Sequence, residues 1–229
     1  MWENFWSRAW VTLVDNTEFL WNALQNTFII AFAGFAIGLV LGTVIAVIKT
    51  NPNNGIVSKV AKSLAWVYIL VLRGTPIVVQ LLLLFFVFLG PAGIPALTVA
   101  VIVFGLNSGA HSAEILRGAI QGIDKGQFEA GRALGLSNVT TMRKVVLPQA
   151  YKNAVPALGN EMISLIKATS VVGFITVIDI TRGMQLIVAR TFDVIVPYML
   201  LAFIYLTVVY LLTVAIKVIE RRVFKIVPN

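Results

Sequence analysis

The stretch EAGRALGLSNVTTMRKVVLP, Glu129 to Pro148, is a polar island in a chain that is otherwise strongly apolar. It belongs to about forty residues, 111–150, that are rich in Lys, Arg, Gln and Gly. The whole chain is 59% hydrophobic and only 12% charged, whereas a soluble domain is usually about 25% charged. We therefore expect a membrane protein in which this segment stays in water and acts there.

Helix signals divide the polar island into two short helices. Asp124 can cap the first helix, with Gln127 as its capping-box partner, and Gly135 can end it in a left-handed conformation. Ser137 can cap the second helix, and Pro148 is expected to stop it. The two helices are predicted to form a compact elbow at the membrane surface that suits docking to another protein.

Three long stretches of the chain carry no charged residue. They lie between Glu18 and Lys49, between Arg73 and Glu114, and between Asp193 and Lys217. Each is longer than the roughly 20 apolar residues that cross a bilayer as a helix. The net charge of +8 lies almost wholly in the connections, so it does not call for nucleic acid as a partner.

The fold class expected from this pattern is an all-α integral membrane protein with five transmembrane helices in a single domain, 1–229. The first expected span carries Gly34, Gly38 and Gly42, and small residues at every fourth position let helices approach closely in lipid. Gly74 and Pro76 interrupt the second. The predicted spans are about 24–48, 63–89, 96–116, 155–178 and 197–218.

The distribution of Lys and Arg predicts the orientation. Thirteen of the eighteen lie beside the elbow, the first connection and the end of the chain. Arg8, Arg182 and Arg190 lie on the opposite side, and Arg73 and Lys167 fall within spans. Because cytoplasmic loops are rich in Lys and Arg, the N-terminus is expected outside, with the elbow and the C-terminus in the cytoplasm.

The first twenty residues, 1–20, are expected to lie along the membrane surface. Trp2, Trp6 and Trp10 recur at every fourth position and share one helix face. Indole rings prefer the headgroup layer, which favours an interfacial helix in contact with membrane lipid. Packing of the same stripe into the core is the alternative.

The spacing within the elbow resembles the EAA motif of ABC-importer permeases. Glu129-Ala130-Gly131 is followed after three residues by Gly135, and after nine more by Val145-Val146-Leu147-Pro148. The family motif is Glu-Ala-Ala, three residues, Gly, nine residues, Ile-x-Leu-Pro. This chain departs from it at Gly131 and at Val145.

Four further segments resemble those of the polar amino acid (His/Glu/Gln/Arg-type) permeases within that family. They are 73–76 (RGTP), 113–120 (AEILRGAI), 159–161 (GNE) and 167–170 (KATS). The resemblance implies a subunit of an ATP-driven importer in the bacterial cytoplasmic membrane. Its implied partners are separate ABC ATPase subunits, a second permease copy or a sister permease, and an extracytoplasmic solute-binding protein.

The resemblance also assigns the elbow, about residues 124–147, to coupling with the ATPase. The residues that it implies for this contact are Glu129, Ala130, Gly131, Ala133, Gly135, Leu147 and Pro148. The chain has no Gly-x-x-x-x-Gly-Lys-Ser/Thr loop, so it is not expected to hydrolyse ATP itself. We expect it to bind no cofactor, with ATP and magnesium held by the partner ATPase.

Charged side chains inside a span cost about 2.5–3.5 kcal/mol each at the helix centre, so they are candidates for function. Asn160, Ser164 and Lys167 fall within about 60° of one helix face, with Glu161 at its edge. An amino acid substrate would offer an ammonium and a carboxylate to these charges. A structural ion pair with neighbouring helices or with a second protomer is the alternative for both Glu161 and Lys167.

Arg73 and Gln80 flank the interruption of the second span. An unwound turn beside Arg73 could contact a substrate carboxylate, or Arg73 could extend to the headgroups. Gln80 is a weaker candidate for lining the pathway. His111 and Glu114 lie three residues apart, and the chain has no other His and no Cys, so no metal site is predicted.

The sequence thus predicts the membrane subunit of an ABC importer for polar amino acids. The main alternative is a secondary amino acid transporter or channel that works without ATP. The odd number of spans, the lack of an internal repeat and the elaborate elbow all speak against that alternative.

Overall fold

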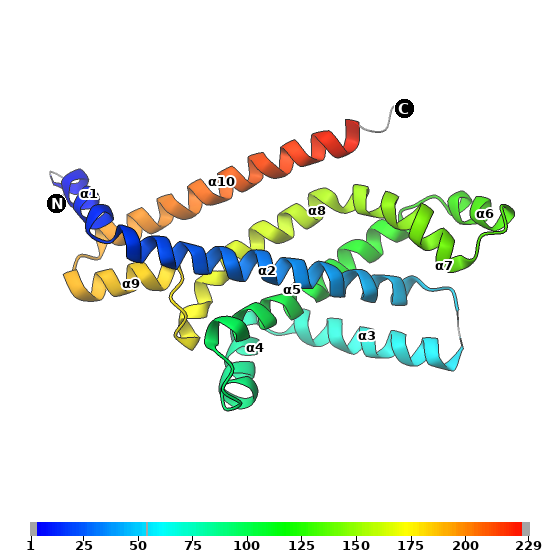
Figure 1. Cartoon of the computed structure of the whole chain (residues 1–229), viewed down its shortest axis with the longest axis horizontal. Helices are drawn as coiled ribbons and strands as arrows, with labels where there is room; N and C mark the ends of the chain where they lie inside the picture. Colours follow the sequence, from blue (N-terminus) through cyan, green and yellow to red (C-terminus); the bar gives the residue numbers. More distant parts are fainter. Residues whose placement is uncertain (1–3, 54, 226–229) are drawn as a thin grey trace.

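The computed structural model describes residues 4–53 and 55–225, which are helical with short connections. Figure 1 shows long helices lying roughly along one axis, with α1 and α9 at one end and α6 and α7 at the other. The longer helices are α1 (Phe5–Asp15), α2 (Thr17–Thr50), α3 (Ile56–Gly74), α5 (Ala96–Gln121), α8 (Leu147–Ala168), α9 (Ile180–Thr191) and α10 (Ile195–Lys225). The shorter ones are α4 (Ile77–Leu83), α6 (Lys125–Ala133), α7 (Asn138–Thr141), the π-helical η1 (Leu84–Leu89) and η2 (Met142–Val146), and the 3₁₀ segment η3 (Thr169–Ile175).

Four helical segments of the described chain are long and apolar enough to cross a membrane. They are Thr17–Thr50, Ala96–Gln121, Asn138–Ile175 and Ile195–Val223. A bent pair, Ile56–Gly74 and Ile77–Leu89, makes a fifth if it counts as one span. The prediction of an all-α protein with several spans is confirmed. The second predicted span is broken where Gly74 and Pro76 are expected to interrupt it, and its two helices are bent by 105°.

The bend has a local cause and a tertiary support. Pro76 cannot donate a backbone hydrogen bond, and Thr75 before it is extended, with φ −119° and ψ 146°. The amide of Gln80 donates to the free carbonyls of Leu72 (2.8 Å) and Thr75 (3.0 Å). Asn107 of α5 donates to Leu72 as well, at 3.1 Å. The break is therefore held by side chains that satisfy its exposed backbone, as membrane depth requires.

The glycines of α2 let it lie directly on α5. An added Cβ would come within 2.9 Å of Phe104 at Gly34, and within 2.6 Å of Ser108 at Gly38. At Gly42 it would come within 2.6 Å of Ser112. The residue numbers of the contacting positions increase together along both helices, so α2 and α5 run parallel. The close packing predicted from the every-fourth-residue pattern is confirmed, and this glycine ladder joins the two helices over about two turns.

The opposite end from the elbow is fastened by backbone capping. Asp179 is fully buried and caps α9, since its carboxylate accepts from the amides of Thr181 and Arg182, both at 3.0 Å. Burial raises the pKa of the Asp179 carboxyl, against the lowering effect of these two donors. Asn26 of α2 donates to the Ile178 carbonyl at 2.9 Å, which ties the connection before α9 to the first span.

The helix α1 carries the predicted tryptophan stripe. Trp6 and Trp10 are 82% and 70% exposed, whereas Ala9 is buried; Trp2 lies outside the described residues. The helix packs on α10 and α2. The indoles of Trp6 and Trp10 are not in the core, so the core-packing alternative is wrong for these two residues. The interfacial placement stays a prediction.

We expect Gly38→Ala to weaken the α2–α5 contact, because the new methyl group would overlap Ser108. Overpacking of this kind costs about 1–3 kcal/mol. The measurement is the thermal unfolding midpoint of the protein in detergent. The control is Gly118→Ala, since a Cβ at Gly118 of α5 meets nothing within 4 Å and alanine favours a helix. An unchanged midpoint for Gly38→Ala would contradict the ladder.

Candidate functional site: a helical elbow and a polar helix face

The first helix of the elbow, α6, begins and ends at the predicted residues. The carboxylate of Asp124 accepts from the Gly126 amide at 2.6 Å. At the other end Gly135 has φ +73°, and its amide donates to the Arg132 carbonyl at 2.9 Å. The Leu136 amide donates to the Gly131 carbonyl at 3.0 Å. These two bonds are those of a Schellman motif, which needs a left-handed residue where Gly135 lies.

Two details of the predicted caps are different in the structure. Gln127 does not close a capping box with Asp124; its side-chain oxygen instead accepts from the amide of Gln149 at 3.2 Å. Pro148 does not stop the second helix, because it lies in the first turn of α8, where a missing N–H is tolerated. The π-helical turn η2 directly precedes α8. Ser137 does cap α7, accepting from the Thr140 amide at 3.2 Å.

The elbow folds back on itself through Gly131. This glycine is buried, and a Cβ there would lie 2.6 Å from Cγ2 and 2.7 Å from Oγ1 of Thr141. The departure of this chain from the Glu-Ala-Ala pattern is therefore a contact between α6 and α7. Gly131 sets how closely the two helices of the elbow approach.

A shared apolar cluster fixes the elbow to the spans. Its buried members on the elbow are Met142 and Val146, and its other buried members come from three neighbouring segments. Those are Ala46 of α2, Leu116, Ile120 and Ile123 at and after the end of α5, and Ala150, Ala154 and Leu158 of α8. The elbow is thus rooted on α2, α5 and α8 together.

The outer surface of the elbow is small and apolar at its tip. Glu129, Ala130, Ala133 and Gly135 are exposed, as is Pro148, while Leu147 is partly buried. Leu134 and Val139 are also exposed, by 79% and 77%. The sequence interpretation missed these two residues, although apolar side chains beside Gly135 in a polar stretch were the available signal.

The polar face predicted on the fourth span is present on α8. Asn160, Ser164 and Lys167 are exposed, and the Ser164 hydroxyl donates to the Asn160 carbonyl at 3.0 Å. Asn153 and Ala157 continue the exposed stripe, so that it recurs at intervals of four and three residues. Glu161 is half-buried at the edge of this stripe.

The residues at the broken span lie differently. Arg73 is exposed in the last turn of α3, within electrostatic range of Glu161 and His111. Gln80 is only 6% exposed, and its amide nitrogen is engaged by the backbone of the break. Its oxygen accepts from Asn107 at 3.1 Å. No group of three or more His, Asp or Glu side chains in the described ranges could hold a metal ion.

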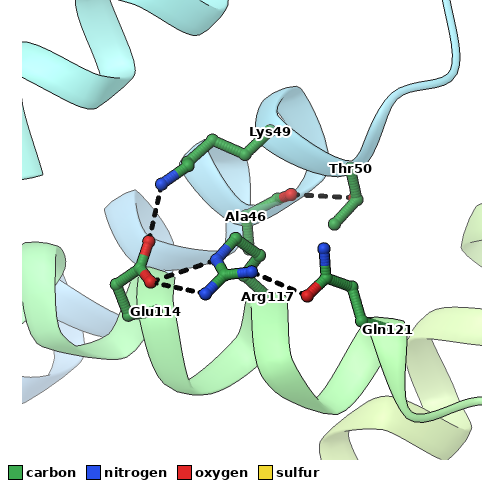
Figure 2. A network of polar contacts seen from close by, with 6 residues as sticks. All are labelled: Ala46, Lys49, Thr50, Glu114, Arg117 and Gln121. Carbon is green, nitrogen blue, oxygen red and sulfur yellow. Dashed lines mark hydrogen bonds and ion pairs between the residues drawn. The ribbon is translucent and has the colours of Figure 1, made fainter.

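A charged network that the sequence interpretation missed joins α2 to α5. Figure 2 shows that Lys49 and Arg117 both donate hydrogen bonds to Glu114, and that Arg117 also donates to Gln121. The signal was the spacing of Glu114, Arg117 and Gln121, three and four residues apart on one helix face. The partner on α2 could be found only from the fold.

The spans, the broken helix and the elbow define a multi-pass helical membrane protein that projects a helical elbow from one end. A family model described as a binding-protein-dependent transport system inner membrane component matches residues 38–225. The chain belongs to this family and is a multi-pass inner membrane permease. Membership implies an ATPase and a binding protein as partners, and places ATP hydrolysis in a partner subunit.

Relatives resemble the chain over nearly its whole length. The L-cystine transport system permease protein TcyB of Bacillus subtilis (strain 168) is 38% identical, covering 95% of this chain and 97% of that protein. The glutamine transport system permease protein GlnP of Escherichia coli (strain K12) is 37% identical, covering 95% and 96%.

Solved structures resemble it as well. One, described as an amino acid ABC transporter with histidines, has a TM-score of 0.81 and 38% identity, covering 93% of this chain and 97% of that one. The MetNI methionine ABC transporter in an inward-facing form has a TM-score of 0.71 at 24% identity, covering 89% and 94%, and supports the fold alone.

We expect Gly131→Ala to loosen the elbow, because its methyl group would overlap Thr141. Thr141→Ala in the same chain removes both overlapping atoms and should restore the packing. The single variant should lose about 1–3 kcal/mol of local stability, measured by hydrogen exchange of the α6 amides. Equal exchange in the single and double variants would show that the Gly131–Thr141 contact does not set the elbow.

Proposed function

We propose that this chain is the membrane subunit of an ATP-driven importer that carries polar amino acids across the bacterial cytoplasmic membrane. The observation that carries the proposal is the exposed elbow. Its residues have the spacing of the EAA motif, and its apolar side packs on α2, α5 and α8. Relatives of the chain are named for glutamine and cystine, and the similar structure is an amino acid transporter with histidines. These names favour a polar amino acid as the substrate.

The elbow, about residues 124–147, is the docking surface for the ATPase. Glu129, Ala130 and Ala133 form a thin exposed face, and Leu134 and Val139 add apolar area at its tip. Gly135 shapes the turn between them, and Leu147 with Pro148 begins the span that leaves the elbow. The Lys and Arg asymmetry favours a cytoplasmic position for this end, with the N-terminus outside.

The transport pathway lies between this chain and a second permease, identical or a sister. The stripe of Asn160, Ser164 and Lys167 is exposed on a single chain, although polar side chains at membrane depth are costly against lipid. A second subunit across this face removes that cost and encloses a polar path. An extracytoplasmic binding protein delivers the substrate to its outer end.

The substrate site combines α8 with the broken span. Glu161 receives the ammonium of the amino acid, and Arg73 or Lys167 receives its carboxylate. Asn160 and Ser164 offer hydrogen bonds between these charges. Gln80 keeps the break open beside Arg73, since its side chain satisfies the carbonyls of Leu72 and Thr75. Such a broken helix beside a charge is a common way to bind a charged substrate in a transporter.

The driving event is outside this chain. ATP and magnesium are held by the ATPase, and this chain needs no cofactor of its own. Closure of two ATPases moves the elbows, and the rooted spans follow, which turns the pathway from inward to outward facing.

The test of the function uses the complex that co-purifies with the tagged chain, reconstituted in vesicles with its binding protein. Labelled L-glutamine, L-cystine and L-histidine are offered in turn, with and without ATP. We expect ATP-dependent uptake of at least one. Uptake that is indifferent to ATP would favour a secondary transporter.

Gly135→Asp should abolish coupled uptake, because a side chain strains the left-handed turn and its carboxylate changes the docking face. The measurement is ATP-dependent uptake together with retention of the ATPase on the tagged chain. Gly93→Asp is the matched control, since Gly93 has φ +77° and equally open surroundings at another turn. Normal coupling in Gly135→Asp would overturn the docking assignment.

Glu161→Gln should reduce uptake by at least about tenfold, because the hydrogen bond from the substrate ammonium would then go to a neutral amide instead of a carboxylate. Binding of the amino acid to the separate binding protein should be unchanged. Glu18→Gln at the exposed start of α2 is the control. A stable complex of Glu161→Gln with full transport would remove Glu161 from the site.

A further inference from the structure

The charged network at the end of α2 and α5 is complete within itself. One oxygen of Glu114 accepts from Lys49 at 2.7 Å, and the other accepts from Nε and Nη2 of Arg117 at 3.0 and 2.8 Å. Nη1 of Arg117 donates to Gln121 at 2.6 Å. Figure 2 shows these side chains bridging the last turn of α2 and the last two turns of α5.

The network is too sheltered to be an ordinary surface ion pair. The side chains of Lys49 and Glu114 are each 19% exposed, and that of Arg117 is 31% exposed. Because Glu114 serves both cations, its loss would leave two positive charges close together with reduced hydration. A partly buried charge without its partner is strongly unfavourable.

The position of the network matters more than its strength. Gln121 is the last residue of α5, and Asp124, which caps the first elbow helix, follows three residues later. On another face of the same turns, Leu116 and Ile120 pack in the apolar cluster with Val146 of the elbow. The end of α5 is therefore the root of the elbow, and Glu114 fastens this root to α2.

Farther from the elbow, the contact of α2 with α5 is of a different kind. Gly38 and Gly42 lie on Ser108 and Ser112, and the buried Ser112 hydroxyl has no hydrogen-bond partner within the described chain. These small-residue contacts contain no directional bond between α2 and α5, and packed helices can slide slightly past one another in shear motions. The charged network, by contrast, fixes the register of the two helices at the elbow end.

We propose that Glu114 is a positioning residue for coupling: it binds the end of α2 to the root of the elbow so that both move as one body. The proposal rests on the proposed function, because it presumes that the elbow receives a movement from the ATPase. Without the network, displacement of the elbow would be lost as sliding between α2 and α5. ATP would then be hydrolysed with less substrate transported.

The first experiment measures substrate transported per ATP hydrolysed in the reconstituted complex. Glu114→Gln should lower this ratio by about fivefold to tenfold, the middle of the range for residues that carry coupling between distant sites. The rate of hydrolysis should fall far less. Arg8→Ala removes a more exposed ion pair, the 3.3 Å contact with Asp193 at the opposite end, and should leave the ratio unchanged.

The second experiment replaces the ion pair by a covalent link. The chain has no native cysteine, so Lys49→Cys with Glu114→Cys can be joined by a short bismaleimide. The unlinked double variant should have the low ratio, and linking should raise it at least about threefold toward wild type. Each single-cysteine variant treated with the same reagent is the control, because it can take up the reagent without being bridged.

The outcomes are distinct. A wild-type ratio in Glu114→Gln, or in the unlinked double variant, would overturn the proposal. A linked variant that hydrolyses ATP but does not transport would also overturn it, because the contact would then have to open. Loss of thermal stability with an unchanged ratio would leave Glu114 a structural residue only and refute the positioning role. Lack of ATP-dependent uptake by the wild-type complex would instead refute the proposed function.

Discussion

The close approach of α2 to α5 is the contact on which the other features depend. Lipid tails are as apolar as the helix surfaces, so helices in a membrane gain little from burying apolar area and must rely on packing. Gly34, Gly38 and Gly42 remove the side chains that would hold the helices apart. With α2 seated on it, α5 becomes the central helix, with α3, α4 and α8 packed around its remaining faces.

The same central helix makes the broken span possible. A bend of 105° between α3 and α4 leaves carbonyls without helical partners, and at membrane depth each would cost several kcal/mol. Asn107 of α5 and Gln80 of α4 supply the missing donors. The break is therefore a property of two packed elements, and Arg73 is exposed beside it because α3 ends there.

Local chemistry made much of this predictable from the sequence, and tertiary contact explains the rest. The caps at Asp124 and Ser137, the left-handed Gly135 and the glycine ladder depend on nearby residues or on a simple repeat. The angle of the break does not depend on such local signals. Neither does the position of Pro148, which lies in the first turn of α8, directly after a π-helical turn. The Gly131–Thr141 and Lys49–Glu114 contacts join separate helices, so spacing along the chain could not reveal them. The substrate-site residues remain predictions.

The arrangement along α5 explains how one helix can serve both ends of the molecule. Its 26 residues carry the ladder in the middle, Asn107 beside the break, and the Glu114 network at the root of the elbow. Asn107 and Glu114 are two helical turns apart, with no Pro between them to bend the helix. A displacement at Gln121 therefore reaches the break along a continuous hydrogen-bonded helix. The helix itself is stiff, so any yielding occurs in the contacts between α5 and its neighbours. The chemistry of the α2–α5 contacts therefore decides how far α2 moves together with α5.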